Sequence, residues 1–113
     1  MAEAEVTLII EIRSYVLKHG TREKLHALLD TEILPLLRDA GIKVVRYGPS
    51  LHDENSYVLI RAFESLGQLR EQEDRFYGSD VWRTGYREMV LGMIESWQDI
   101  VIEVDESALT ALS

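Results

Sequence analysis

The stretch Val6–Leu17, with the sequence VTLIIEIRSYVL, decides the fold because it has the pattern of a β-strand. It is rich in β-branched residues, and its side chains alternate with the two-residue period of a strand. One face is wholly apolar and consists of Val6, Leu8, Ile10 and Ile12. The other face begins apolar, becomes polar, and consists of Thr7, Ile9, Glu11, Arg13 and Tyr15. We therefore predict a strand that is buried on one face and meets a more polar surface on the other.

A helix is predicted after this strand, between Gly20 and Gly41. Thr21 is a suitable N-cap, and Gly41 is a suitable terminator. An apolar stripe at helical spacing follows the N-cap and consists of Leu25, Leu28, Leu29, Ile33, Leu36, Leu37 and Ala40. Pro35 interrupts this pattern, because proline has no N–H group to donate and costs about 3 kcal/mol inside a regular helix. We therefore expect a kink near Pro35.

Two more strands are predicted over Ile42–Gly48 and Tyr57–Glu64. The connection PSLHDENS is rich in turn-forming residues and short enough for an antiparallel hairpin. Ser65 and Gln68 then form a capping box, which predicts that a second helix begins at Ser65. Its charge run, residues 70–75, is interpreted as a solvent-facing side.

A further helix is predicted to begin near Asp80 and to extend to Trp97. Its apolar stripe consists of Trp82, Tyr86, Met89, Val90, Met93, Ile94 and Trp97. A last strand is predicted over Ile100–Val104, and residues 105–113 are expected to form a loose tail.

The resulting order, β-α-β-β-α(α)-β, predicts an α+β fold of the ferredoxin-like, split βαβ class. Its four-stranded antiparallel sheet would carry helices on one face, in a single domain spanning residues 1–113 with a core of about 6–104. Apolar residues occur in both phases of the strands, and Ile9, Val45, Leu59 and Val101 cannot all remain in contact with water. We therefore predict a homodimer in which the bare faces of two sheets pack together.

Composition excludes several functional classes. Lys and Arg number 12 against 20 Asp and Glu, and this acidic balance argues against a nucleic-acid partner. The chain has no cysteine, which excludes disulfides, thiolate nucleophiles and Cys-based metal sites and is compatible with the cytoplasm, where we expect the protein. The apolar runs are too short to cross a membrane, and the acidic start Met1–Glu5 is unlike a secretory signal.

Three segments together resemble one known family. Ile10–Gly20, IEIRSYVLKHG, resembles the E-x-R-x-Y-x-L-x-x-G opening of the NIPSNAP family, and Glu32–Val45 resembles the helix and strand that follow it. Ser79-Asp80-x-Trp82 is similar to the S-D-P-x-W helix start of that family, although Val81 stands where proline is usual. The resemblance extends over about residues 8–104. It implies the dimeric α+β barrel shared by antibiotic-biosynthesis monooxygenases, haem-degrading monooxygenases and small polyketide cyclases, and it implies no particular reaction.

A polar cluster is predicted on the first strand, where Glu11, Arg13 and Tyr15 share one face. Arg61 and Glu103 are expected on the same face of the sheet. The cluster has two interpretations: a pocket floor in which an arginine binds an anionic or enolate oxygen, or a charge-balanced lattice that closes the inner face of the dimer. The lattice is the favoured interpretation, because structural ion pairs cluster in the same way.

Aromatic residues give a second candidate site. Trp82 and Tyr86 lie one helical turn apart, so they either line an aromatic pocket between helices and sheet or belong to the core. Tyr15, Tyr47 and Tyr57 are open to the same two interpretations. The candidate ligand-binding residues are Arg13, Tyr15, Tyr47, Arg61, Trp82 and Tyr86.

No metal or cofactor is predicted. Glu23-x-x-His26 is the one spacing typical of a metal site, but di-iron bundles need that motif twice, and His19 and His52 have no evident partner. Hydrolase, nucleotide-binding and dinucleotide-binding motifs are absent from the sequence.

Three functional hypotheses follow. The favoured one is a homodimeric protein that holds a small apolar or aromatic molecule in a pocket between sheet and helices. The second is a cofactor-independent tailoring enzyme, a monooxygenase or cyclase, acting on a polycyclic aromatic substrate. The third is a structural interaction module. A closed pocket reached by an ionisable side chain distinguishes them.

Overall fold

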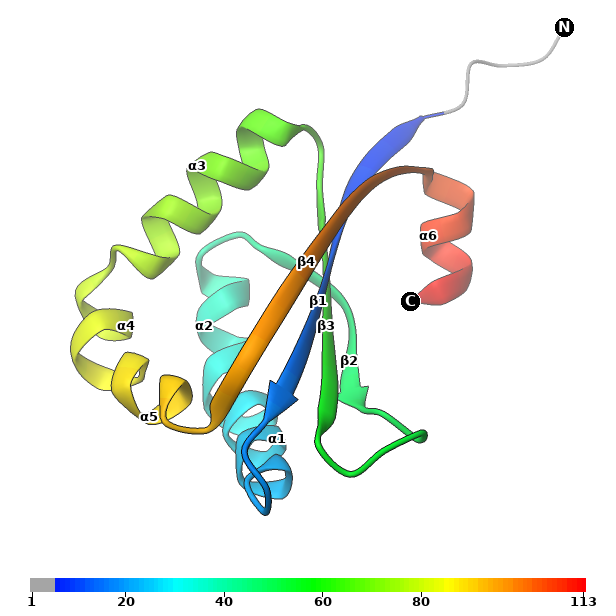
Figure 1. The fold of residues 1–113 in the computed structure, drawn as a ribbon. Coiled ribbons are helices and arrows are strands. Elements are labelled where there is room, and N and C mark those ends of the chain that lie inside the picture. The colour runs from blue at the N-terminus through cyan, green and yellow to red at the C-terminus, as the bar shows by residue number, and fades with distance from the viewer. Residues whose placement is uncertain (1–5) are drawn as a thin grey trace, which may run out of the picture.

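Four antiparallel strands form one sheet in the order β2-β3-β1-β4 (Figure 1). The computed structural model describes residues 6–113, so the acidic start, which argued against a secretory signal, lies outside the described residues. The strands are β1 (Thr7–Leu17), β2 (Lys43–Pro49), β3 (Ser56–Phe63) and β4 (Ile94–Asp105). This topology confirms the predicted α+β, ferredoxin-like class.

Most of the helices lie on one side of the sheet (Figure 1). They are α1 (Arg22–Leu28), α2 (Leu34–Asp39), α3 (Leu66–Tyr77), α4 (Asp80–Gly85) and α5 (Arg87–Leu91). Their apolar faces and the sheet enclose the main core, whose most deeply buried members include Leu17, Leu25, Leu37, Ile42 and Tyr57. Within residues 6–113, no helix combines the length and the apolar character needed to span a membrane.

The structure shows what forms at the predicted helix cap, Ser65, and at the predicted kink, Pro35. Ser65 caps α3 as predicted, because its Oγ accepts a hydrogen bond from the backbone N–H of Gln68 at 3.0 Å. Near Pro35 the chain forms a π-helical turn, η1 (Leu29–Ile33), in which the N–H of Leu34 bonds to the carbonyl of Leu29. A π-helical turn, rather than the expected kink, therefore precedes Pro35, whose nitrogen has no N–H group to donate to the helix.

The boundary between the last helices and β4 differs from the prediction. The helical segment ends at Leu91, and β4 begins at Ile94 and pairs along the whole of β1, from Leu17 opposite Ile94 to Thr7 opposite Asp105. The predicted helix to Trp97 is wrong because long-range pairing with β1 satisfies the backbone of this segment better than one more helical turn. Trp97 therefore lies on β4, opposite Tyr15.

The C-terminal segment also differs from the prediction. Residues expected to form a loose tail form helix α6 (Glu106–Leu112), which lies on the other side of the sheet (Figure 1). Leu109 is 2% exposed and packs with Ile10, Val45 and Ala62. Helices are therefore not confined to one face, and part of the face expected to be bare is covered.

The residues used to argue for a dimer are distributed differently from the prediction. Ile9 and Leu59 belong to the helix-side core, and Val45 is buried beneath α6. Val101 is paired with Glu11 and so shares the helix side, where it is 40% exposed.

Candidate functional site

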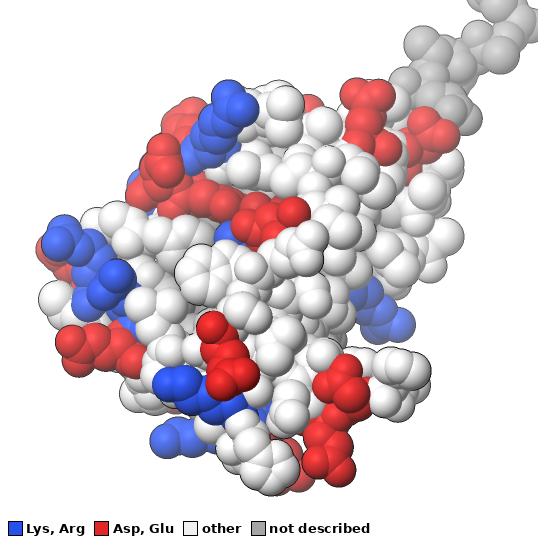
Figure 2. Space-filling model, in the orientation of Figure 1, with Lys and Arg blue, Asp and Glu red and all other residues white. Residues whose placement is uncertain are grey.

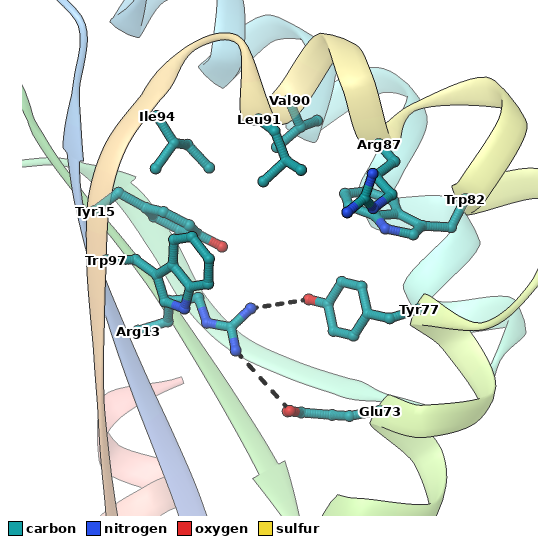
Figure 3. A pocket seen from close by; sticks show the side chains of 10 residues that line it. All are labelled: Arg13, Tyr15, Glu73, Tyr77, Trp82, Arg87, Val90, Leu91, Ile94 and Trp97. Carbon is teal, nitrogen blue, oxygen red and sulfur yellow. Dashed lines mark hydrogen bonds and ion pairs between the residues drawn. The ribbon is translucent and has the colours of Figure 1, made fainter.

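A cavity of about 310 Å³ lies between the helix side of the sheet and helices α3 to α5 (Figure 3). Its volume is at the lower end of the range of about 300–1,000 Å³ that is usual for small-molecule sites. The lining residues are Arg13, Tyr15, Glu73, Tyr77, Trp82, Arg87, Val90, Leu91, Ile94 and Trp97. We refer to this space as the cavity.

Trp82 forms one aromatic wall and is held in a defined orientation. Ser79 caps α4 by accepting a hydrogen bond from the N–H of Trp82, and its hydroxyl donates to the carbonyl of Phe76 at 2.6 Å. The indole is 8% exposed, with its ring centroid 5.6 Å from that of Phe76 and 5.2 Å from that of Tyr77. In Figure 3, Trp82 and Arg87 face the cavity from the helices, while Tyr15 and Trp97 face it from the sheet.

The polar end of the cavity is centred on the hydroxyl of Tyr77. It accepts hydrogen bonds from Nη1 of Arg61 at 2.7 Å and from Nη1 of Arg13 at 3.2 Å. Arg61 is fully buried and donates to Glu11, and its Nη2 lies 3.2 Å from Oε2 of Glu73. This residue therefore lies beneath the cavity floor and acts on it through Tyr77 and Glu73.

Arg13 lies beside this group and is held by a carboxylate on β4. Its Nε and Nη2 donate to the two oxygens of Asp99 at 2.7 and 3.0 Å, a bidentate pairing that fixes the plane of the guanidinium. Its Nη2 also lies 4.0 Å from Oε1 of Glu73. Arg13 is thus oriented towards the cavity by a partner outside the cavity lining.

Strand register brings these polar residues together. Glu11 is directly opposite Arg61, and Arg13 is directly opposite Asp99, so each arginine meets a carboxylate across an antiparallel pair. Glu103 is opposite Ile9 and so lies on the expected face of the sheet, but no ion pair of Glu103 occurs in the described part of the chain. Sequence reasoning missed Asp99 because the predicted strand began only at Ile100, whereas β4 begins at Ile94.

Glu73 and Tyr77 were also missed. Glu73 belongs to the charge run of α3, which was interpreted as solvent-facing, yet its side chain is only 14% exposed. The spacing of four residues between Glu73 and Tyr77 is the signal that places both on one face of α3. The rest of the charge run behaves as expected: Arg70, Glu71, Asp74 and Arg75 are exposed, and Glu71 pairs with Arg75. Basic and acidic side chains both occur on the face of the molecule shown in Figure 2.

Burial changes the protonation of several groups. The pKa of Glu73 rises to about 7 because its carboxyl is removed from water and faces Glu11, while the charge of Arg61 acts in the opposite direction. The pKa of Tyr15 rises to about 12, mainly through burial. Burial alone would lower the pKa of Arg13, but its hydrogen bond to Asp99 and the electrostatic effects of Tyr77, Tyr15 and Asp99 together raise it. The cavity thus contains a permanent cation beside a carboxyl that exchanges its proton near neutral pH.

Three predicted site residues lie outside the cavity lining: Arg61, which lies beneath the cavity floor, Tyr47 and Tyr86. The hydroxyl of Tyr47 on β2 donates to Asp30, and the hydroxyl of Tyr86, between α4 and α5, donates to Glu32 at 3.1 Å, so both bond to carboxylates of η1. Of the six candidate residues, the structure brings Arg13, Tyr15 and Trp82 to the cavity and Arg61 beneath it.

The spacing typical of a metal site, Glu23-x-x-His26, places His26 beside a tyrosine. His26 Nδ1 is hydrogen-bonded to the hydroxyl of Tyr57 at 2.6 Å. Among residues 6–113 there is no group of three or more His, Asp or Glu side chains suited to a metal ion.

Comparisons with known proteins identify relatives of this chain. The family model for NIPSNAP matches residues 10–106. A NIPSNAP family protein with unknown function from Agrobacterium tumefaciens is 22% identical, with a TM-score of 0.82 over 93% of this chain and 95% of that chain. A second NIPSNAP family protein from Agrobacterium tumefaciens is 14% identical, with a TM-score of 0.81 over 97% and 96% of the two chains.

A proposed antibiotic biosynthesis monooxygenase from Nitrosomonas europaea is 14% identical, with a TM-score of 0.66 over 90% of this chain and 93% of that chain. Identities this low show a shared fold and carry no function with them. A search of curated proteins found no match.

Proposed function

The chain belongs to the NIPSNAP family, and from that premise we propose that it is a homodimeric protein that binds a small aromatic molecule bearing a carbonyl or anionic oxygen. The observation that carries this proposal is the cavity, in which an apolar wall meets Arg13 and the phenol hydroxyls of Tyr15 and Tyr77. Such a combination, mostly apolar with a few convergent polar groups, is typical of small-molecule sites.

The polar end of the cavity has hydrogen-bond donors that can bind an oxygen of a ligand. A guanidinium has five N–H groups, and Arg13 uses three of them on Asp99 and Tyr77, which leaves two. The oxygen of Tyr77 accepts two hydrogen bonds from the arginines, so its own hydrogen is left to donate. An oxygen of a bound molecule would satisfy these donors and would gain a charge-assisted hydrogen bond from Arg13.

The opposite end of the cavity suits a flat apolar body. Trp82 and Trp97 present indole surfaces from the helices and the sheet, and Val90, Leu91 and Ile94 complete the apolar lining. Aromatic pairs gain about 0.5–1.5 kcal/mol beyond area burial, which favours planar molecules over aliphatic ones of equal size. Arg87 is exposed at the rim, where it would attract an anion before binding.

The homodimer is supported by apolar residues on the face opposite α1 to α5. Val16, Ile100 and Ile102 share that face and are 42%, 52% and 43% exposed, while α6 covers the part of it around Ile10. In addition, β4 is a long edge strand, and such edges are normally covered or paired. A second copy presents the same apolar surface, so a two-fold interface satisfies both chains at once.

The proposal is tested with 2-naphthoate and its uncharged counterpart naphthalene, titrated against the tryptophan fluorescence of the protein. We expect 2-naphthoate to bind about 10–100-fold more tightly than naphthalene, because a hydrogen bond to a charged group contributes about 1.5–3 kcal/mol. Arg13→Met should remove that preference. Arg46→Met, which removes an exposed arginine from β2, is the matched control and should keep it.

Two results would refute the proposal. Absence of binding by either probe, together with a stable dimer in sedimentation velocity, favours the structural interaction module instead. A preference for 2-naphthoate that survives Arg13→Met places the binding elsewhere on the protein.

A further inference from the structure

The carboxyl of Glu73 is unusual among the acidic groups of this protein. Its Oε2 is buried and accepts no hydrogen bond of good geometry within residues 6–113, although Nη2 of Arg61 lies 3.2 Å away. Its Oε1 lies 4.0 Å from Nη2 of Arg13, beside the cavity. Glu71, two residues earlier on the same helix, is 70% exposed and pairs with Arg75. Glu73 is therefore a carboxyl at the edge of the cavity with fewer hydrogen bonds than it can accept. Burial of a carboxyl in this way costs stability, which points to a functional role for Glu73.

Charge balance does not require Glu73. The two cations of the cluster are already matched, since Asp99 holds Arg13 and Glu11 holds Arg61. Glu73 is a third carboxylate beside two cations, so a purely structural lattice would be complete without it.

The surroundings of Glu73 suit a group that changes protonation. The charged and titratable groups around it come from four elements and are Glu11, Arg13 and Tyr15 on β1, Arg61 on β3, Tyr77 on α3 and Asp99 on β4. Burial and the facing carboxyl of Glu11 raise the pKa of Glu73 to about 7, against the effect of Arg61. Both forms of the carboxyl are then present at neutral pH, which is the condition for efficient general acid–base catalysis.

We propose that Glu73 removes a proton from a carbon next to the carbonyl group of the bound molecule and returns it to carbon, so that the cavity catalyses reversible formation of the enolate. This inference rests on the ligand binding proposed above and names the chemistry at the same cavity. It assigns Glu73 the role of proton acceptor and donor, and it assigns Arg13 and the two tyrosines the role of holding the carbonyl oxygen.

The steps balance without any co-reactant. The C–H bond breaks, its proton goes to Oε1 of Glu73, and its electron pair forms a carbon–carbon double bond while the carbonyl π pair moves onto oxygen. The resulting enolate oxygen accepts hydrogen bonds from the free N–H groups of Arg13 and from the hydroxyl of Tyr77, donors that strengthen as negative charge develops. Glu73 then returns the proton to the same carbon or to another carbon of the conjugated system, and nothing is oxidised or reduced.

The test uses 2-tetralone, a bicyclic ketone with acidic C–H groups beside its carbonyl. Exchange of those hydrogens in D₂O is followed by proton NMR, and binding of the same compound is followed by tryptophan fluorescence. We expect the protein to accelerate exchange over buffer, and we expect Glu73→Gln to lower that rate about 100-fold or more, because general-base catalysis contributes about 10²–10⁴-fold. Glu71→Gln removes a carboxylate from the exposed side of the same helix and should leave the rate unchanged.

A pH profile of the unmodified protein gives a second readout that does not depend on folding of a variant. Since the carboxylate form accepts the proton, the protein-catalysed rate should rise between about pH 6 and 8 and then level off. Glu73→Gln should lose this rise.

The outcomes separate this inference from the proposed function. Binding of 2-tetralone without accelerated exchange overturns the role of Glu73 and leaves the binding site intact. Equal exchange rates in the unmodified protein and in Glu73→Gln, or a flat pH profile, also overturn it. Failure of 2-tetralone to bind removes the proposed site and this inference with it.

Discussion

Replacement of Arg61 by methionine should destabilise the protein severely. Arg61 is fully buried, and its partner Glu11 is 2% exposed, so the substitution leaves a carboxylate in the protein interior without its cation. Removal of one partner of a buried ion pair costs about 3–5 kcal/mol. Tyr77 also loses the hydrogen bond that Arg61 donates at 2.7 Å, which adds about 1 kcal/mol. The sum, about 4–6 kcal/mol, is a large part of the 5–15 kcal/mol that typically stabilises a domain.

Urea unfolding followed by circular dichroism measures this loss. With a slope of about 2 kcal/mol per molar urea, a loss of about 4 kcal/mol moves the midpoint by about 2 M. The double variant Arg61→Met with Glu11→Leu removes both charges and should recover about 3 kcal/mol or more, because apolar replacements of a whole buried pair are often neutral. Protein concentration is held constant throughout, since the proposed dimerisation would make the measured stability depend on it.

Arg75→Met provides the control, because Arg75 pairs with Glu71 on the exposed side of α3. An exposed pair of this kind contributes about 0–1 kcal/mol. If Arg61→Met costs no more than Arg75→Met, or if the double variant is no more stable than the single one, the reasoning about a buried charge pair is refuted.

Three other predictions concern the walls of the cavity, the interface and pH. Trp82→Ala should lower the affinity for 2-naphthoate and reduce stability by about 3–5 kcal/mol, because Trp82 is only 8% exposed. Trp97→Ala should also lower the affinity but reduce stability by less than about 1 kcal/mol, because Trp97 is 52% exposed. Fluorescence of the remaining tryptophan measures affinity, and thermal melts measure stability. Ile102→Lys should dissociate the homodimer in sedimentation velocity without unfolding the chain, and an unchanged sedimentation coefficient would contradict the proposed interface. The raised pKa of Glu73 means that the folded state holds this proton more tightly than the unfolded state, so its contribution is present below about pH 4.5 and is lost as pH rises to about 7. Unfolding measured across that range should therefore show a fall in stability that Glu73→Gln removes, and parallel curves for the two proteins would contradict the assignment.

Local patterns predicted the elements whose own residues determine them. The alternation in Val6–Leu17 predicted β1, and the serine at the start of the second helix predicted its cap, because each signal lies within a few residues of the structure that it specifies. The order of these elements, with the three family-like segments, was enough for the ferredoxin-like class and for the NIPSNAP family.

Sequence reasoning failed where two local patterns fitted the same residues. Met93, Ile94 and Trp97 continue a helical stripe, yet the segment from Ile94 pairs with β1. The deciding energy is the set of backbone hydrogen bonds to a strand about 80 residues away, which no local window contains. The same holds for α6, whose Leu109 is ordered by packing on the sheet.

The candidate site also contains some residues that local patterns predicted and others that only the tertiary structure revealed. Arg13 and Tyr15 were recognised because alternation places them on one face of β1, and Trp82 because it begins an apolar stripe. Their partners were decided only by tertiary structure: Asp99 by the register of β4 against β1, and Glu73 by the rotation of α3 over the sheet. A sequence thus determines which side chains share a face of one element, whereas the chemistry of this cavity depends on groups up to 86 residues apart, which only strand pairing and the packing of helices on the sheet bring within hydrogen-bonding distance.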